Sequence, residues 1–146
     1  MTMHIRMADE ADLGVVLKLY TELHDEAAPP PSDGLTRLWA GIMADPNRYV
    51  VLVEIDRTVA GSCELIIVPN LTHNQRPYGL IENVVTGPAF RRQGCALAAL
   101  NHAKAIAMDQ NCYKLMLMTG GRDGNHALYE KAGFNRHDKT AFVQWL

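Results

Sequence analysis

The sequence predicts a mixed α/β fold. We expect a single domain over residues 1–146, in which about four helices flank a twisted, mixed and mostly antiparallel sheet of six to seven strands. The 146 residues match the usual length of one domain. Segments with apolar residues at helical spacing are interspersed with runs of β-branched residues. The strand–helix–strand order between Tyr78 and Met118 predicts a parallel crossover, which is right-handed in nearly all proteins.

The first third of the chain predicts one strand followed by two helices. The short run Met3–Met7 fits a strand. Asp9 has a side chain suited to cap a helix over Glu10–His24, whose apolar residues recur at helical spacing. Three consecutive prolines then require a loop. Ser32 caps a second helix, which Asp45-Pro46 ends.

The middle of the chain predicts three strands. Tyr49–Ile55 and Thr58–Val68 are rich in β-branched and apolar residues, and Asp56-Arg57 between them supplies a turn, so the two runs form a hairpin. A polar loop over Pro69–Pro77 leads to a further extended run, Tyr78–Thr86.

The last third predicts two helices and two strands. A long Ala-rich helix over Gln93–Asp109 leads to a strand over Tyr113–Met118. A short helix over Asn125–Ala132 is stopped by Gly133. We expect Ala141–Leu146 to be the last strand. Because this strand is apolar it needs covering, and a second subunit in a homodimer would cover it.

The composition argues against several classes of function. The chain has 14 basic and 16 acidic residues, so it lacks the positive excess of a nucleic-acid-binding surface. No apolar stretch approaches the roughly 20 residues that cross a bilayer, and the first residues lack the apolar region of a signal peptide. Three cysteines without paired spacing, and no His or carboxylate cluster, argue against disulfides and bound metal. We therefore expect a cytoplasmic protein.

The segment that carries the clearest chemistry is the turn before the long helix. Its residues Arg91–Ala96 read Arg-Arg-Gln-Gly-Cys-Ala. The first turn of a helix offers unpaired N–H groups and the positive end of the helix dipole. Gly94 lets a ligand approach the backbone, and the two arginines add positive charge. These features predict a phosphate or pyrophosphate site, although the turn alone also fits solvated arginines before an ordinary helix.

A second motif gives a resemblance to a known family. Arg91–Ala96 fits the pattern Arg/Gln-x-x-Gly-x-Gly/Ala, with Val84-Val85 and Pro88 ahead of it. Leu128–Phe134 fits the run Leu/Phe-Tyr-Glu-x-x-Gly-Phe. The two motifs and the element order resemble the GNAT superfamily of acetyl-coenzyme A-dependent N-acetyltransferases over essentially the whole chain. Within that superfamily, the sequence is most similar to the branch that contains glucosamine-phosphate N-acetyltransferases.

The resemblance implies that acetyl-coenzyme A is the cosubstrate and that no metal takes part. The pyrophosphate is expected at the start of the long helix, and the pantetheine arm along the end of the preceding strand. That strand and the one from Tyr113 are expected to diverge, so that an N–H near Val84 or Val85 polarises the thioester carbonyl. The residues expected to contact coenzyme A are Asn83, Val84, Val85, Arg91, Arg92, Gln93, Gly94, Cys95, Ala96, Asn125 and Tyr129.

The reaction implied is direct attack of a neutral amine on the thioester, with no covalent enzyme intermediate. Tyr129 matches the family's tyrosine that protonates the departing thiolate; a packing role is the alternative. Strand alternation places Glu82 on one face with Val84 and Thr86, and Asn83 on the other. A carboxylate in this apolar strand needs a role or a partner. Glu82 could accept a proton, bind the substrate cation, or pair with an arginine as a structural group.

The chain departs from the family pattern at two places. Family members often carry an asparagine seven residues before the tyrosine, where this chain has Arg122. Whether Arg122 or Asn125 takes over the contact with the pantetheine arm stays open. Cys95 stands where Gly or Lys is commoner. A helix N-terminus and two arginines would lower its thiol pKa and make it reactive, whereas the alternative is a small buried side chain.

Three functions are compatible with these features. The first is acetyl transfer to a small-molecule amine, such as an amino sugar or amino acid. The second is a non-catalytic acyl-coenzyme A-binding or sensor domain, against which the presence of Tyr129 and Glu82 argues. The third is an unrelated phosphate-binding α/β protein, and the missing P-loop and dinucleotide glycines argue against it.

Overall fold

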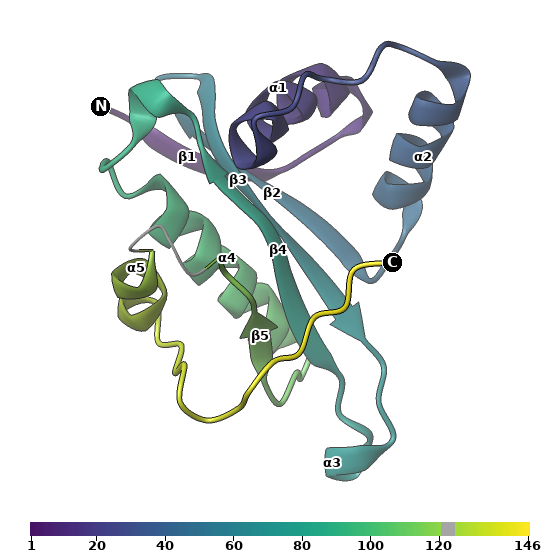
Figure 1. Ribbon diagram of the computed structural model, residues 1–146, viewed down its shortest axis with the longest axis vertical. Coiled ribbons are helices and arrows are strands. Elements are labelled where there is room, and N and C mark those ends of the chain that lie inside the picture. Colours follow the sequence, from purple (N-terminus) through teal and green to yellow (C-terminus); the bar gives the residue numbers. More distant parts are fainter. Residues whose placement is uncertain (121–124) are drawn as a thin grey trace.

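The computed structural model describes residues 1–120 and 125–146 (Figure 1). The described strands are β1 (Met3–Met7), β2 (Arg48–Ile55), β3 (Thr58–Val68), β4 (Tyr78–Thr86) and β5 (Leu115–Leu117). The described α-helices are α1 (Leu13–His24), α2 (Asp33–Ala44), α3 (Thr72–Gln75), α4 (Cys95–Asp109) and α5 (His126–Lys131). Short 3₁₀ turns over Glu10–Asp12 and Pro88–Phe90 precede α1 and α4.

The five strands form one mixed sheet in the order β1-β2-β3-β4-β5. The first four strands pair antiparallel with their neighbours, and β4 pairs parallel with β5. The helix α4 joins this parallel pair, as expected for a strand–helix–strand crossover. The end of β4 therefore leads directly into the turn before α4.

Helices cover both faces of the sheet (Figure 1). Val51 and Val53 of β2 enter the core shared with α4, whereas Val50 and Leu52 enter a smaller core shared with α1 and α2. This strict alternation is what a strand buried on both faces requires. The side of α4 that faces the sheet is made largely of alanines, which lets the helix lie close to it. Among the described residues, every helix is too short or too polar to cross a bilayer.

Two predicted helix caps are confirmed. The Asp9 carboxylate accepts a hydrogen bond from the Ala11 N–H at 2.8 Å, and the Asp12 carboxylate accepts one from the Asp9 N–H at 2.8 Å. Ser32 Oγ accepts a hydrogen bond from the Leu35 N–H at 3.1 Å. Each cap satisfies an N–H group that has no partner inside the helix.

The predicted mixed α/β fold is confirmed, but the expected number of six to seven strands is wrong, because the described residues form a sheet of five strands with three antiparallel pairings and one parallel pairing. Ala141–Leu146 is not a strand in the structure: Phe142 and Trp145 are 93% and 92% exposed. Apolar composition favours a strand, but a strand forms only against a partner edge, and this segment pairs with no described strand. The predicted loop Pro69–Pro77 contains α3.

A β-bulge interrupts β4 at Asn83, whose φ is +52°. Ser62 of β3 pairs with Val85, and Glu64 pairs with Glu82, so two steps along β3 span three steps along β4. The extra residue of β4 locally disrupts the pairing, as in other bulges.

The bulge changes which side chains of β4 share a face. Ile81 and Val84, three residues apart, both pack against the core beneath α4. Asn83 faces the opposite way, where its Nδ2 donates to Oε2 of Glu64 at 3.1 Å. The regular alternation predicted through Glu82, Val84 and Thr86 is therefore wrong, because it holds only in an uninterrupted strand.

Candidate active site

The turn before α4 presents a backbone suited to bind an anion. Arg92 and Gly94 have φ values of +61° and +86°, and Gly94 is the N-cap of α4. Left-handed residues in such a turn direct N–H groups into a common concavity, to which the first turn of a helix adds its own unpaired N–H groups. A Cβ on Gly94 would meet no atom within 4 Å, so the concavity is open at this point.

A cavity of about 720 Å³, here called the first cavity, extends from this turn. Besides residues of the turn, β4 and α5, it is lined by Glu22 and Leu23 of α1. The residues predicted to contact coenzyme A that line this cavity are Val84, Val85, Arg91, Arg92, Gly94, Cys95, Ala96, Asn125 and Tyr129. The structure thus gathers segments from β4, the turn and α5 into one space.

The other two residues of the predicted set lie elsewhere. Gln93 donates from Nε2 to the carbonyl oxygen of Ala89 at 3.2 Å, within the turn itself. Asn83 is directed toward Glu64, on the α1 side of the sheet. Arg122, the alternative to Asn125, lies outside the described residues.

The strands β4 and β5 diverge at the first cavity. Their pairing ends at Ile81 opposite Leu117. Beyond that point β4 continues to Thr86, and the edge that faced β5 has no strand partner among the described residues. Val84 and Val85, which line the first cavity, belong to this unpaired stretch. Backbone groups are therefore available there for an extended ligand.

Basic side chains outnumber acidic ones in the first cavity. Arg91, Arg92 and Lys131 line it, together with the acidic Glu22. Arg91 Nη2 lies 3.7 Å from Glu22 Oε2, and the two side chains are 56% and 38% exposed. An exposed pair of this kind contributes little to stability, so Arg91 is available to a ligand anion. The charge and the N–H groups together fit a diphosphate ester.

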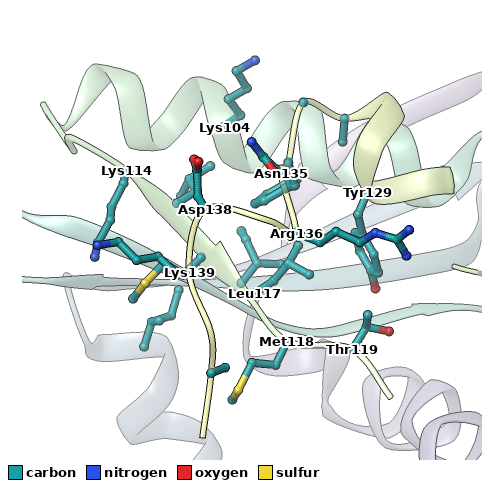
Figure 2. A pocket seen from close by; sticks show the side chains of 18 of the residues that line it. Lys104, Lys114, Leu117, Met118, Thr119, Tyr129, Asn135, Arg136, Asp138 and Lys139 are labelled. Atoms are coloured by element: carbon teal, nitrogen blue, oxygen red, sulfur yellow. The ribbon is translucent and has the colours of Figure 1, made fainter. Parts of the chain in front are cut away.

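Tyr129 of α5 lines the first cavity and a second one. Figure 2 shows its hydroxyl directed toward Thr119. Burial raises the pKa of the Tyr129 phenol above its ordinary value, and the Thr119 side chain partly opposes this. The phenol is therefore protonated at neutral pH and can donate a proton or a hydrogen bond.

The second cavity has a volume of about 980 Å³ and lies between β5, α4, α5 and the chain after α5 (Figure 2). Glu82, Thr119 and Tyr129 all line it. Lys114 and Lys139 line it as well, and their side chains point away from Tyr129. The cavity therefore combines a carboxylate, a phenol and cationic groups.

Glu82 lines the second cavity and not the first. The structure therefore brings both predicted catalytic residues, Glu82 and Tyr129, to one cavity. Glu82 is exposed, so its carboxylate is within reach of solvent. Among the described residues, no three His, Cys, Asp or Glu side chains form a group that could hold a metal ion.

The predicted lowering of the Cys95 pKa is wrong. Cys95 is 2% exposed, and its Sγ lies 3.8 Å from the carbonyl oxygen of Phe90. Burial raises the pKa of the Cys95 thiol, and a hydrogen bond with the Cys95 backbone only partly opposes this. The alternative interpretation, a small buried side chain, fits the structure.

Several residues near the site escaped the sequence analysis. Thr119 lies at the Tyr129 hydroxyl, and Glu22 and Leu23 of α1 reach the first cavity. Helical spacing predicts α1, but it does not show which turn of the helix lies beside β4. For the buried Glu64, a carboxylate within an otherwise apolar β3 was the available signal.

Comparison with known proteins decides the family. The acetyltransferase (GNAT) family matches residues 15–134. The chain belongs to this family. This GNAT chain is accordingly an acetyl-coenzyme A-dependent N-acetyltransferase, and the resemblance carried by its two motifs is confirmed.

Individual relatives agree with this assignment. A glucosamine 6-phosphate N-acetyltransferase of Trypanosoma brucei brucei is 29% identical over 143 residues, which cover 94% of this chain and 92% of the relative. A solved structure from Agrobacterium tumefaciens strain C58, provisionally described as an acetyltransferase, is 34% identical with a TM-score of 0.89, covering 97% of this chain and 99% of that one. Glucosamine-6-phosphate N-acetyltransferase from Arabidopsis thaliana has a TM-score of 0.86 at 20% identity, covering 100% and 99%, which shows a common fold.

Proposed function

We propose that this GNAT enzyme transfers an acetyl group from acetyl-coenzyme A directly to the primary amine of a small molecule, without a covalent enzyme intermediate. The observation that carries the proposal is the position of Tyr129. This residue lines both the cavity that holds the anion-binding turn and the cavity that holds Glu82. A donor in the first cavity and an acceptor in the second would meet at its hydroxyl.

The first cavity fits the donor. The N–H groups from Arg92 to Ala96 would bind the diphosphate, with added charge from Arg91. Acetyl-coenzyme A, when bound, supplies an activated acyl thioester. Val84 or Val85, in the stretch of β4 beyond its pairing with β5, would offer its N–H group to the acyl oxygen, where negative charge develops during attack.

The two side chains at the junction handle the protons. The nitrogen of the neutral amine attacks the acyl carbon, the new N–C bond forms, and the C–S bond breaks with its electron pair going to sulfur. Glu82 accepts the proton that the amine loses, directly or through a water molecule. Tyr129 gives its hydroxyl proton to the departing sulfur and regains one from solvent.

The acceptor class supported best is an amine that also carries an anionic group, such as a phosphorylated amino sugar. The basic side chains of the second cavity slightly outnumber its acidic ones: Lys104, Lys114, Arg136 and Lys139 line it beside Glu82, Glu130 and Asp138. Ammonium groups bind phosphate as point charges. The relative from Trypanosoma brucei brucei is named for glucosamine 6-phosphate, and we extend that class of acceptor to this chain.

Thiol release at saturating acetyl-coenzyme A tests the proposal. The panel contains glucosamine, glucosamine 6-phosphate and several amino acids. We expect turnover, with kcat/KM for the phosphorylated sugar at least about tenfold above that for glucosamine, because desolvated ion pairs to phosphate are strong. A non-catalytic acyl-coenzyme A sensor would instead bind acetyl-coenzyme A in a calorimeter and release thiol with no amine.

We also propose a homodimer. β5 is three residues long and pairs with β4 alone among the described strands. Near it runs a segment in which Phe142, Trp145 and Leu146 are exposed. A second copy would cover these apolar groups. We expect light scattering at micromolar concentration to give twice the chain mass of 16.2 kDa. A monomer under those conditions would contradict the proposal.

We propose a cytoplasmic location because the cysteines of the protein are free thiols. Cys63, Cys95 and Cys112 are free thiols, and the first two are buried. Free thiols persist most readily in a reducing compartment. Fractionation of cells that express the natural protein would test this location, and recovery outside the cytoplasmic fraction would contradict it.

A further inference from the structure

A buried carboxylate joins the three central strands of the sheet, and the proposed mechanism does not use it. Glu64 of β3 is 3% exposed. Its Oε1 accepts hydrogen bonds from the guanidinium of Arg48 on β2, through Nε at 2.7 Å and through Nη2. Its Oε2 accepts a hydrogen bond from Nδ2 of Asn83 on β4 at 3.1 Å. One carboxylate oxygen therefore pairs with Arg48, and the other binds Asn83 in the bulge.

Stability alone is a weak reason for such a group. Burying a carboxylate and a guanidinium removes both from water, and apolar residues of the same volume often give an equally stable protein. What apolar residues could not supply is an acceptor for Asn83. The Glu64–Asn83 hydrogen bond points to a role in local geometry.

Asn83 needs an anchor because of its backbone conformation. Its φ of +52° lies in the left-handed region, which is unfavourable for a residue with a Cβ, although asparagine tolerates it better than most. A hydrogen bond from an amide to a carboxylate is stronger than one to a neutral acceptor. Glu64 thus holds residue 83 in the conformation that creates the bulge.

A second contact from β3 constrains the same stretch. A Cβ at Gly61 would lie 2.9 Å from the carbonyl oxygen of Val85, so the two backbones approach more closely there than a larger residue permits. The bulge is therefore constrained at Asn83 by Glu64 and at Val85 by the close approach of Gly61. Val84 and Val85 follow it directly and line the first cavity. The direction of their N–H groups depends on the conformation of residue 83.

We propose that Glu64 is a positioning residue for acyl transfer: by anchoring Asn83, it directs the backbone of Val84 and Val85 toward the acyl group held in the first cavity. The inference rests on the proposed function, because it assumes an acyl thioester in that cavity. Glu64 lines neither cavity, so it acts through the bulge.

The ligand-free protein gives a test that does not depend on acetyl-coenzyme A. Backbone chemical shifts report the φ of residue 83 in Glu64→Ala and in Glu64→Gln. In Glu64→Ala we expect the φ of residue 83 to leave the left-handed region. In Glu64→Gln, which keeps an acceptor oxygen, we expect that φ to stay positive. Asn83→Asp keeps a side chain that tolerates a positive φ but has no donor for Glu64, so it removes the same hydrogen bond and gives the answer if Glu64→Ala fails to fold. A left-handed residue 83 in the variant that lacks the bond would overturn the inference.

A double-mutant cycle tests the functional consequence. Glycine adopts a positive φ without an anchor, so Asn83→Gly should make the bulge independent of Glu64. We expect Glu64→Ala to lower kcat/KM for acetyl-coenzyme A about tenfold in the natural background, as for loss of one charged hydrogen bond, and less than about threefold in the Asn83→Gly background. Equal losses in both backgrounds would overturn the inference.

A matched control and a spectroscopic reading complete the test. Glu54→Ala removes a half-buried carboxylate that pairs with Arg6 Nε at 2.7 Å and lines neither cavity, and it should leave kcat/KM unchanged. The ¹³C shift of bound [1-¹³C]acetyl-coenzyme A should move upfield in Glu64→Ala, because a polarising N–H is lost. If the natural protein fails to bind acetyl-coenzyme A, the proposed function fails, and the backbone shifts still decide whether Glu64 holds the bulge.

Discussion

The ring of Tyr129 meets the ring of Phe134 edge to face, with centroids 6.3 Å apart and planes at 83°. Gly133, with a φ of +99°, turns the chain so that the Phe134 N–H donates to the carbonyl oxygen of Tyr129 at 2.9 Å. The spacing of the Tyr-Glu-x-x-Gly-Phe motif therefore has a direct physical meaning. It folds the chain back onto its own tyrosine and holds the phenol between the two cavities.

Replacing the phenol tests its role as a proton donor. In Tyr129→Phe we expect kcat to fall about 100-fold, since general acid catalysis contributes at least that much, while the Kd for coenzyme A stays within twofold. Steady-state thiol release and calorimetry measure the two quantities. Tyr49→Phe, a half-buried tyrosine outside both cavities, is the control. A fall in kcat of less than threefold would assign Tyr129 to packing.

Removing the carboxylate of Glu82 should affect the acceptor half of the reaction. We expect Glu82→Gln to lower kcat/KM for the amine at least about tenfold, because no base remains to accept the proton. Coenzyme A binding should be normal. Glu10→Gln is a control, since this exposed carboxylate lies outside both cavities. A loss of less than about tenfold with normal coenzyme A binding would rule out Glu82 as the base.

The turn before α4 should be sensitive to a single methyl group. In Gly94→Ala we expect the Kd for coenzyme A to rise about tenfold, because a left-handed residue with a Cβ costs roughly 1–2 kcal/mol and the turn relaxes out of its binding conformation. Gly41→Ala is a matched control: its Cβ also meets open space, but it lies within α2 at an ordinary helical φ. Equal affinities for both variants would place the diphosphate elsewhere.

Alkaline pH should destabilise the fold through Tyr20. Burial first, and then the charge of Glu64, raise the pKa of Tyr20 from 10.0 to about 12. Between these values the unfolded chain loses the proton while the folded chain keeps it, so the free energy of unfolding falls as pH rises. Urea denaturation from pH 9 to 12 should show that the free energy of unfolding falls with pH. In Tyr20→Phe this fall should be smaller, by at most about 2 kcal/mol. Parallel curves for the two proteins would contradict this expectation.

Much of the fold follows from local pattern. The hairpin of β2 and β3 is recognisable because β-branched runs flank a two-residue turn, and Asp9 and Ser32 mark helix starts because their side chains satisfy free N–H groups. The hairpin and the caps depend on residues close together in the sequence. That the turn before α4 and Tyr129 share a cavity is implied by the resemblance to the family rather than by local pattern.

Features that depend on distant partners could not be predicted in this way. The bulge at Asn83 arises from Glu64 and Gly61 on another strand, and asparagine alone is a weak signal for a positive φ. For Cys95 the sequence offers both a reactive and a buried side chain, and only the packing of neighbouring segments, which buries the thiol and raises its pKa, decides between them. Residues 141–146 are apolar enough for a strand, but pairing depends on an available edge.

The chain has two tryptophans, and the fold puts them in opposite surroundings. Trp39 is 6% exposed and donates from Nε1 to the carbonyl oxygen of Glu10 at 3.1 Å, whereas Trp145 is 92% exposed. Intrinsic fluorescence therefore carries two separable signals. Quenching by iodide reports whether the terminal segment is covered, and a red shift of the protected emission reports the loosening of α2 from the sheet.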